Sequence, residues 1–337
     1  MMPDDNDNRL PDSPPQQDPT DEDRDEPAQA PGQDAPPAFG TAPGYRSGFV
    51  AVLGLPNVGK STLVNCFFDN DPCIVSYKPQ TTRFHIRCIS TDEKRQIVFV
   101  DTPGWHARGR GLGAFMRREI THSLSGADLL LFLVDAVHPD LERNRYAHAV
   151  LMQGVNTPRV LAVNKIDRIG STRVAALLDQ FYKVFEPKEI VPISASEETN
   201  IDELDRVMTA LLPEGPPLYP PETVVDKPQE FLITEFIREQ LYTVTREEIP
   251  FSCAVELVSV DRNLDPIHVE ANILVEKQSQ KGILIGAGGS MIARIRRLSG
   301  VRIKRFFGRP VDLSLWVKVH PKWAADELLL SRMGEGV

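Results

Sequence analysis

Residues 54–61 read Gly-Leu-Pro-Asn-Val-Gly-Lys-Ser, which fits the pattern G-x-x-x-x-G-K-[ST] at every fixed position. An apolar run at 48–53 precedes this stretch, and residues 61–67 have the composition of the first turns of a helix. A glycine-rich loop between a buried strand and a helix directs backbone N–H groups at a phosphate. The motif therefore predicts a phosphate-binding loop within an α/β sheet.

Strand-like and helix-like segments alternate between residues 46 and 212. The expected strands after the loop lie at 84–90, 95–100, 128–134, 159–163 and 189–193, the first two forming a hairpin. The expected helices lie near 113–125, 140–153, 171–184 and 200–212. This alternation predicts a doubly wound, mostly parallel P-loop sheet, whose ligands bind at the carboxyl ends of the strands.

Four short motifs fall at those strand ends: 54–61, 101–104 (Asp-Thr-Pro-Gly), 164–167 (Asn-Lys-Ile-Asp) and 194–195 (Ser-Ala). Each of the last three is weak alone, since Asp-Thr-Pro-Gly is more often a surface turn. Their joint order and their placement at strand ends remove that alternative. One ligand is expected to touch all four.

The first two motifs suit a nucleotide triphosphate with a metal ion. Lys60 should bridge the β- and γ-phosphates, Ser61 should coordinate Mg²⁺, and Asp101 should supply the second contact to the metal. The Gly104 N–H can reach the γ-phosphate. The loop residues expected to complete the nucleotide contacts are Gly54, Asn57, Val58, Gly59 and Thr62.

The last two motifs select the base. Asp167 can accept two hydrogen bonds from guanine N1 and N2, a pairing that adenine cannot offer. Asn164 should steady the base, the Lys165 stem should pack on its face, and Ser194 and Ala195 can place backbone donors near guanine O6. GTP or GDP is therefore the expected nucleotide, rather than ATP.

Residues 76–83, Ser-Tyr-Lys-Pro-Gln-Thr-Thr-Arg, are polar and without periodicity. They lie where a segment ordered by γ-phosphate and Mg²⁺ belongs, with a threonine hydroxyl as a metal ligand. Both Thr81 and Thr82 qualify, and Thr82 is preferred. We call residues 76–83 the first switch segment.

A second mobile segment is expected at 105–113. Trp105 stands where Ras-like switches carry the Gln that orients the attacking water, so slow intrinsic hydrolysis is expected. Asn57 is a candidate ligand for K⁺ in place of an arginine finger; the alternative is that it only shapes the loop. The expected catalytic set is Lys60, Thr82, Asp101, Gly104 and Asn57.

The 337 residues carry a net charge of −9 that is confined to one end of the chain. Residues 1–44 hold 11 Asp/Glu against Arg9 and Arg24, and the remainder sums to zero. This proline-rich segment is expected to be a disordered, solvated extension and not a signal peptide. No run reaches about 18 apolar residues, and the four cysteines have no metal-ligand or disulfide spacing. A reducing cytoplasm fits these features.

A proline-rich connector at 213–227 predicts a domain boundary before a second folded unit at 228–337. That unit is expected to contain a helix at 229–242 and strands at 251–260, 267–275 and 311–319. Residues 277–309 hold nine Lys/Arg and no Asp or Glu. Such segregation of charge indicates a polyanionic partner.

Within the basic stretch, Gly286-Ala287-Gly288-Gly289 has apolar residues on both sides. A lone G-x-x-G is more often a plain turn. Here its context predicts a KH domain, with the turn joining two short helices and clamping single-stranded RNA. The expected RNA contacts are Lys281, Gly286, Ala287, Gly288, Gly289, Arg294, Arg296 and Arg297, and Arg302 is expected to touch phosphate as well.

Together, these motifs resemble the Era family of bacterial GTPases, a G domain followed by a type II KH domain. The resemblance covers residues 46–330 and rests also on Pro79-Gln80-Thr81-Thr82-Arg83, on 275–282 and on Leu315-Trp316-Val317-Lys318-Val319. It implies GTP hydrolysis, binding of the 3′ end of 16S rRNA through the KH groove, and a role in maturation of the 30S subunit. A cytoplasmic monomer is expected, with peripheral contact with the inner membrane left open.

Two alternatives compete with this interpretation. A double-G-domain ribosome-assembly protein would need a second phosphate loop, which this chain lacks. An RNA-binding module with a vestigial nucleotide site is disfavoured by the intact Lys60, Ser61, Asp101 and Asp167. The acidic segment 1–44 and Trp105, where the family usually has a smaller apolar residue, depart from the Era pattern.

Overall fold

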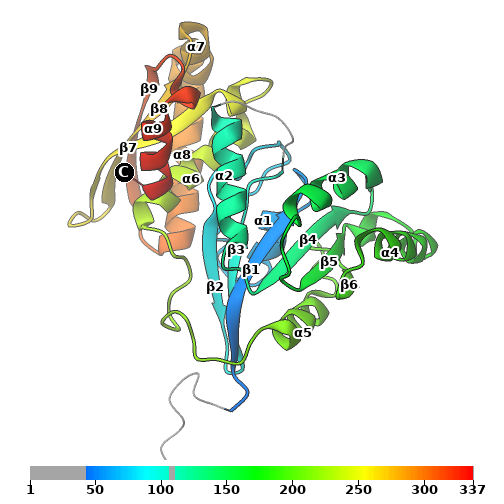
Figure 1. Ribbon diagram of the computed structural model, residues 1–337. Helices are drawn as coiled ribbons and strands as arrows, with labels where there is room; N and C mark the ends of the chain where they lie inside the picture. Colours follow the sequence, from blue (N-terminus) through cyan, green and yellow to red (C-terminus); the bar gives the residue numbers. More distant parts are fainter. Residues whose placement is uncertain (1–42, 106–110, 337) are drawn as a thin grey trace, which may run out of the picture. The chain divides into compact units, whose positions relative to one another are not determined.

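The computed structural model describes residues 43–105 and 111–336, all of which fall within one unit of the chain. The unit contains two sheets, one of six strands and one of three (Figure 1). The predicted acidic extension and most of the second mobile segment, residues 106–110, lie outside the described residues. Within the part of the chain that the structure describes, no helix is long and apolar enough to cross a membrane.

The six-stranded sheet has the order β2-β3-β1-β4-β5-β6. Its strands are β1 (Arg46–Gly54), β2 (Ile86–Thr91), β3 (Arg95–Asp101), β4 (Leu129–Asp135), β5 (Arg159–Asn164) and β6 (Glu189–Pro192). All neighbours run parallel except β2 and β3, which form the predicted hairpin. This arrangement confirms the predicted P-loop α/β class.

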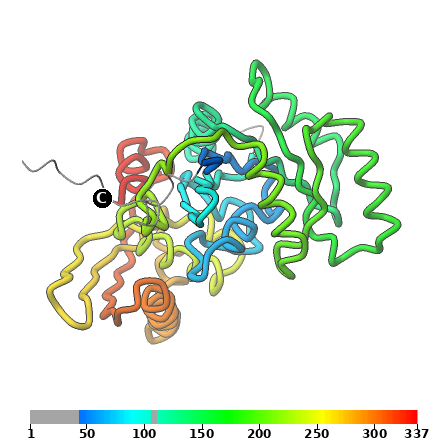
Figure 2. Tube along the Cα trace, turned by 90° about the horizontal axis from the view of Figure 1, so that it is seen from below, coloured from blue at the N-terminus to red at the C-terminus, as the bar shows by residue number. Residues whose placement is uncertain are grey.

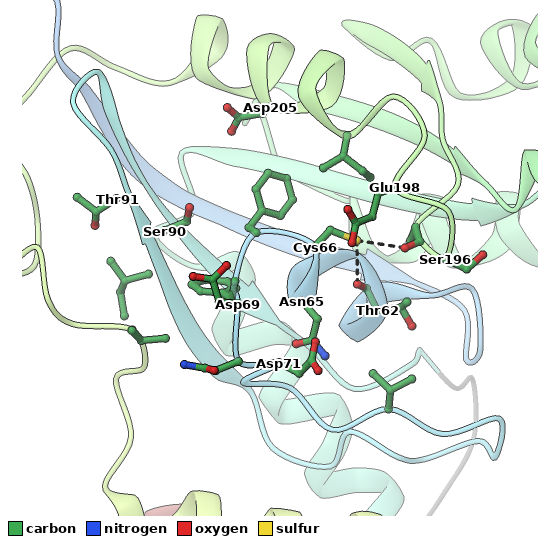
Figure 3. Close-up of a pocket in the computed structure, with 18 of the residues that line it drawn as sticks. Thr62, Asn65, Cys66, Asp69, Asp71, Ser90, Thr91, Ser196, Glu198 and Asp205 are labelled. Atoms are coloured by element: carbon green, nitrogen blue, oxygen red, sulfur yellow. Dashed lines mark hydrogen bonds between the residues drawn. The ribbon is translucent and has the colours of Figure 1, made fainter. Parts of the chain in front are cut away.

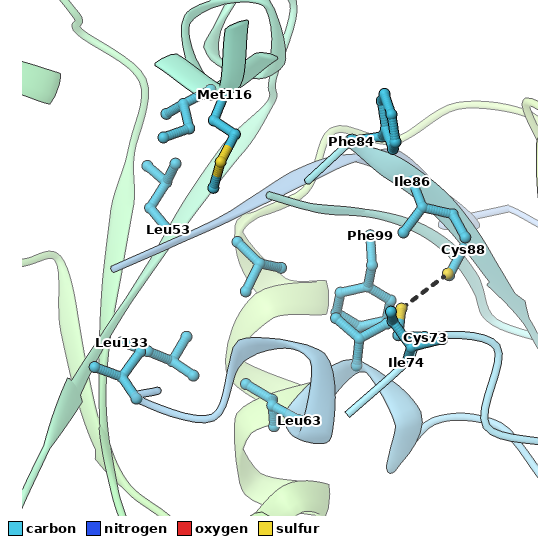
Figure 4. Close-up of a cluster of buried hydrophobic side chains, with 14 of the residues drawn as sticks. Leu53, Leu63, Cys73, Ile74, Phe84, Ile86, Cys88, Phe99, Met116 and Leu133 are labelled. Carbon is cyan, nitrogen blue, oxygen red and sulfur yellow. Dashed lines mark hydrogen bonds between the residues drawn. The ribbon is translucent and has the colours of Figure 1, made fainter. Parts of the chain in front are cut away.

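Five helices accompany these strands: α1 (Lys60–Asn65), α2 (Leu112–Leu124), α3 (Leu141–Leu151), α4 (Ser171–Phe185) and α5 (Ile201–Leu211). The central strands are buried along almost their whole length, as expected for parallel strands covered on both faces. Figure 4 shows part of this core, in which Leu63 of α1 and Met116 of α2 lie near Leu53 and Phe99 of the sheet. The strand ends are thereby held rigidly for ligand binding.

The proline-rich connector is pinned along the edge of this sheet. The Ile89 N–H of edge strand β2 donates to the Val224 carbonyl over 2.8 Å, and the Gln96 amide donates to the Tyr219 carbonyl over 2.8 Å. The segment between α5 and α6 can be followed past β2 in Figures 1 and 2. It covers backbone groups that an open edge would expose.

The second sheet has the order β7-β8-β9, from β7 (Cys253–Asp261), β8 (Ile267–Val275) and β9 (Val311–Val319). Its main helices are α6 (Gln229–Val244), α7 (Gln278–Ile285) and α8 (Ser290–Phe307). The two helices around G-x-x-G were expected to be short, but α8 has 18 residues. Its buried Ile295, Ser299 and Ile303 lie four residues apart and form one buried stripe, which sustains the helix.

A C-terminal helix, α9 (Glu327–Glu335), was not anticipated from the sequence. The Asp326 side chain caps it by accepting from the Leu329 N–H, and Leu330 and Met333 are buried. The described chain therefore remains part of the fold up to residue 336.

Candidate functional site

The phosphate loop connects β1 to α1 with glycine at two positions that exclude other residues. Gly54 has φ +145°, and a Cβ there would lie 2.5 Å from the Leu133 carbonyl oxygen. Gly59 has φ +101°, and its Cβ would lie 2.3 Å from Nδ2 of Asn164. The loop backbone can take this path only because both side chains are absent.

Lys60 is buried at the start of α1. Its Nζ donates to the carbonyls of Gly54 (3.3 Å) and Leu55 (3.1 Å) within the loop. Burial lowers the pKa of Lys60 to about 8, and the nearby charge of Asp101 opposes that shift. A phosphate entering the loop would add negative charge beside Lys60 and raise its pKa.

Three oxygen-bearing side chains converge beside Lys60. Ser61 Oγ donates to Oδ2 of Asp101 over 2.6 Å, and the hydroxyl of Thr82 lies 2.9 Å from Ser61 Oγ and 3.3 Å from the same carboxylate oxygen. Oδ1 of Asp101 is buried without a hydrogen-bond partner. Burial raises the pKa of Asp101, while the hydrogen bond from Ser61 and the charge of Lys60 lower it.

This cluster fits a magnesium ion. Hydroxyl and carboxylate oxygens are hard ligands, and Mg²⁺ is usually held by one or two carboxylates together with substrate phosphates. Among residues 43–105 and 111–336, no group of three or more His, Cys, Asp or Glu side chains could hold a metal. Thr81, the alternative to Thr82, instead contacts Ser76 Oγ and donates to the Lys78 carbonyl.

The first switch segment closes over the phosphate loop. Lys60, Ser61, Gln80, Thr82 and Gly104 line one pocket of about 60 Å³. Pockets for small-molecule ligands have roughly 300 Å³ or more. A nucleoside triphosphate must therefore displace the Lys60 ammonium or part of the switch segment in order to enter.

Asn164, at the end of β5, ties three segments together. Its Nδ2 donates to the Val58 carbonyl (2.9 Å), and its Oδ1 accepts from the N–H groups of Lys165 (2.8 Å) and Ala195 (3.0 Å). Lys165 Nζ donates to the Asn57 carbonyl over 2.7 Å. The base-selecting motifs are thus joined to the phosphate loop.

Sequence reasoning missed Asp135, the last residue of β4. Its Oδ2 lies 2.6 Å from Lys165 Nζ, and the hydrogen bond and charge of Lys165 outweigh burial and lower the pKa of Asp135. Its position, directly after a predicted strand next to β5, was the available signal. The ion pair fixes the Lys165 stem where a base could stack.

Asp167 is oriented by Ser194, whose Oγ donates to Asp167 Oδ1 over 2.6 Å. The backbone prediction for Ser194 and Ala195 needs correction. The Ser194 N–H donates to the Thr199 carbonyl, and the Ala195 N–H is taken by Asn164. The Ser194 N–H is therefore not available to guanine O6. The Ala195 N–H could reach O6 only through a bifurcated hydrogen bond that it shares with Asn164.

Trp105 is buried, although it follows Asp-Thr-Pro-Gly in a loop. Its backbone N–H donates to the Gly54 carbonyl over 3.1 Å, and its ring meets Tyr146 of α3 edge-on at 5.5 Å. Gly104 is equally confined, because a Cβ there would lie 2.7 Å from Cα of Pro56. Trp105 is placed to exclude water near the loop rather than to orient it.

A larger cavity of about 1120 Å³ opens beside this site. Figure 3 shows Thr62 of α1 and Cys66, which directly follows α1, on its wall, together with the carboxylates of Asp69, Asp71 and Glu198. Acidic side chains outnumber the arginines that also line this cavity (Arg95, Arg302 and Arg305), so its charge disfavours phosphates. The phosphates therefore belong in the small pocket at the loop, despite its size.

The G-x-x-G turn lies exposed at the head of α8. Gly286, Gly288 and Gly289 have φ of +73°, +58° and +81°, and a Cβ on Gly288 or Gly289 would meet nothing within 4 Å. Arg294, Arg296 and Arg297 are exposed on the first turns of α8, and Lys281 is half-buried on α7. The predicted RNA-binding residues therefore surround one turn.

A groove of about 840 Å³ runs from these arginines along α8 to the start of β9. Its apolar floor includes Val301 and Leu313, and Arg294, Arg297 and Lys304 also line it. Apolar surface bordered by arginine suits nucleobases whose phosphates lie at the rim.

The expectation that Arg302 binds phosphate is wrong in this structure. Arg302 Nε donates to Glu239 over 3.0 Å, its guanidinium also bonds the Asp71 carbonyl, and it lies 4.0 Å from the centre of the Phe236 ring. Arg305 pairs with Asp71 over 3.0 Å. The basic stretch thus serves two purposes, and the acidic partners Glu239 and Asp71 distinguish the arginines that hold the fold.

Comparison with known families defines the class of protein. Residues 49–165 match the family described as "50S ribosome-binding GTPase", and residues 248–324 match the KH domain family. The first match includes the phosphate loop, Thr82 and Asp101, and the second includes the G-x-x-G turn and α8. The chain is a P-loop GTPase that carries a KH domain.

Relatives identify the family. The chain is 40% identical to GTPase Era of Clostridium acetobutylicum over 292 residues, covering 86% of this chain and 98% of the relative. It is 42% identical to GTPase Era of Carboxydothermus hydrogenoformans, again over 292 residues, with 86% and 98% covered. The chain belongs to the Era family of GTPases and hydrolyses GTP.

Solved structures agree. The fold matches a single-residue variant of Aquifex aeolicus Era bound to GDP·AlF₄⁻ with a TM-score of 0.82 and 34% identity, covering 87% of this chain and all of that one. It matches Era in complex with MgGDPNP and nucleotides 1506–1542 of 16S ribosomal RNA with a TM-score of 0.83, at the same identity and coverage. The alternative of a vestigial nucleotide site is thereby set aside.

The lowered pKa of Lys60 predicts that nucleotide binding is coupled to proton uptake. Because its pKa is about 8 in the nucleotide-free protein and phosphate raises it, binding should take up almost no proton at pH 7 and about half a proton at pH 8. Titration calorimetry in buffers of different ionisation enthalpy measures this uptake. Equal heats in all buffers at pH 8 would contradict the assignment.

The role assigned to Asp167 predicts that one substitution changes the preferred base from guanine to xanthine. Asp167→Asn should weaken GTP binding and improve xanthosine triphosphate binding, because an amide can pair with the carbonyl that replaces the guanine amino group. Asp167→Ala is the matched control and should weaken both. Competition binding with a fluorescent nucleotide measures the ratio, and equal loss for both nucleotides in Asp167→Asn would refute the role.

Proposed function

We propose that this GTPase binds the 3′ end of 16S rRNA through its KH groove and assists assembly of the 30S ribosomal subunit. The observation that carries the proposal is the exposed G-x-x-G turn directly before α8, the helix whose exposed arginines line a groove. The Era structure that holds nucleotides 1506–1542 of 16S rRNA supports it, because the two folds match over 87% of this chain. Ribosome biogenesis is the process that this activity serves.

We propose Mg²⁺ as the metal cofactor, held by Ser61, Thr82 and Asp101. The ion would neutralise charge that develops on the β- and γ-phosphate oxygens. Lys60 would place its ammonium between the same phosphates, and the loop N–H groups would bind their remaining oxygens. The Gly104 N–H would contact the γ-phosphate, and Trp105 would keep bulk water away.

A further positive charge is needed near the leaving phosphate, since Trp105 offers none. We propose that Asn57 helps to bind K⁺ there, in the place of an arginine finger. Asn57 sits in the left-handed region (φ +63°), and its Nδ2 donates to the Tyr77 carbonyl over 3.1 Å. This contact joins the phosphate loop to the first switch segment.

The remaining parts of the proposal concern the protein's surroundings. We expect a cytoplasmic monomer that works on the 30S subunit, with peripheral contact with the inner membrane as an additional location. The four free cysteines are compatible with a reducing compartment.

Two carboxylates at the turn should abolish RNA binding. In a protein carrying Ala287→Asp and Gly288→Asp, the new charges would meet the phosphates of a short rRNA 3′-end oligonucleotide directly. Asn263→Asp with Leu264→Asp, on the exposed β7–β8 loop, is the matched control and should bind normally. Filter binding measures both proteins. Undiminished affinity of the turn variant would place the RNA elsewhere.

The salt dependence of binding should separate the two kinds of arginine on α8. Arg297→Ala should reduce the slope of log affinity against log salt by about one counterion. Arg305→Ala, whose side chain pairs with Asp71, should leave the slope unchanged. The reverse pattern would overturn the assignment of the RNA-facing side of α8.

Hydrolysis should be faster in KCl than in NaCl at equal ionic strength. Asn57→Ala should erase the difference, because the cation loses a ligand. Asn57→Asp, which keeps an oxygen at the same place, should retain it. Single-turnover rates measure the effect, and identical rates in both salts for the unaltered protein would exclude a K⁺ site.

A further inference from the structure

Arg83 follows the proposed metal ligand Thr82 and is 2% exposed, an unusual burial for a guanidinium. Its side chain reaches the second sheet. Nη1 donates to the Cys253 carbonyl over 2.8 Å, and Nη2 donates to the Pro250 carbonyl (3.2 Å) and to Tyr242 Oη (3.1 Å). The guanidinium also lies 5.9 Å from the ring centre of Tyr242 and 5.3 Å from that of Trp323.

Tyr242 holds the chain on the other side of Thr82 as well. Its hydroxyl accepts from Arg83 and donates to the Gln80 carbonyl over 2.8 Å. Lys78 Nζ donates to the carbonyls of Tyr242 and Thr245 at the C-terminal end of α6, where the helix dipole favours a cation. One hydroxyl therefore bridges residues 80 and 83 and fixes the backbone that carries Thr82.

Neighbouring residues reinforce this junction. Phe84 packs edge-on against Phe115 of α2 at 5.5 Å and against Phe231 of α6 at 5.8 Å. His85 Nδ1 lies 2.7 Å from Oε2 of Glu119 on α2. Contacts with α2 of the first sheet and with α6 and β7 of the second therefore set the direction of the chain on leaving Thr82. Thr82 itself turns toward Ser61 and Asp101.

We propose that Arg83 and Tyr242 are positioning residues for GTP hydrolysis. They hold residues 80–83 so that the Thr82 hydroxyl meets the metal and the γ-phosphate. The proposal rests on the metal-binding role proposed for Thr82. It makes α6 and the start of β7 part of the GTPase machinery, although they belong to the RNA-binding part of the chain.

The decisive comparison is between GTP and GDP, since only the triphosphate needs Thr82. In Arg83→Ala, kcat for GTP should fall about tenfold to a hundredfold, because a small misplacement of a positioned group is costly. GDP affinity should stay within about twofold, because the diphosphate does not use the positioned hydroxyl. Arg83→Lys, which retains the charge and one set of donors, should recover part of kcat. Arg87→Ala is the matched control. Arg87 lies four residues after Arg83 and pairs with Asp226 instead of Tyr242, so its removal should leave kcat unchanged.

Tyr242→Phe removes only the bridging hydroxyl and keeps the packing, so it tests the proposal even if Arg83→Ala fails to fold. It should lower kcat while KM and GDP affinity remain. Unchanged kcat in Tyr242→Phe, or an equal loss of affinity for GDP and a GTP analogue in Arg83→Ala, would overturn the positioning role. Thr82→Ala is the reference variant. If Thr82→Ala leaves kcat unchanged, the proposed metal role of Thr82 is wrong. If only Thr82→Ala lowers kcat, the positioning role of Arg83 and Tyr242 is wrong.

Discussion

The carboxylate of Asp101 is buried at the end of β3 with one oxygen unpaired, and a buried charge is stable only when it is compensated. Ser61 and Thr82 satisfy the other oxygen, and Lys60 lies close by with only carbonyl partners. The charges of Lys60 and Asp101 offset each other's burial only in part, because burial still lowers the pKa of Lys60 and raises that of Asp101. A metal-bound nucleotide would add a cation beside Asp101 and phosphate charge beside Lys60, and the parallel sheet brings the base-selecting residues to the same edge.

The sequence predicted the G domain well, because its motifs are local and each lies beside a strand of recognisable composition. Asp135 was missed, since its role depends on the pairing of β4 with β5, across which Asp135 and Asn164 are partners in register. Arg302 was misassigned for a similar reason. Composition shows that α8 is basic, but only the fold shows which arginines meet Glu239 and Asp71. The length of α8 and the presence of α9 likewise depend on packing between distant segments.

The sequence predicts two domains joined by a linker, but the predicted domains and the linker make many contacts with one another. The linker lies along β2, and the first switch segment is bonded to the end of α6. Arg302 and Arg305 both bond Asp71, in the loop before that segment. Helix α8 thus carries the G-x-x-G turn at one end and touches the G domain toward the other. RNA and GTP sites on this chain share one set of packed elements, which provides a physical route for coupling.

Hydrogen–deuterium exchange of residues 76–85 and 242–253 tests most directly whether the γ-phosphate site and the second sheet share one segment. With Mg²⁺ and a non-hydrolysable GTP analogue, both stretches should become protected relative to the GDP complex, since Thr82 and its anchors are fixed together. Arg83→Ala should confine protection to the first stretch. Identical exchange in the two nucleotide states, or protection of the switch segment alone in the unaltered protein, would contradict the shared segment.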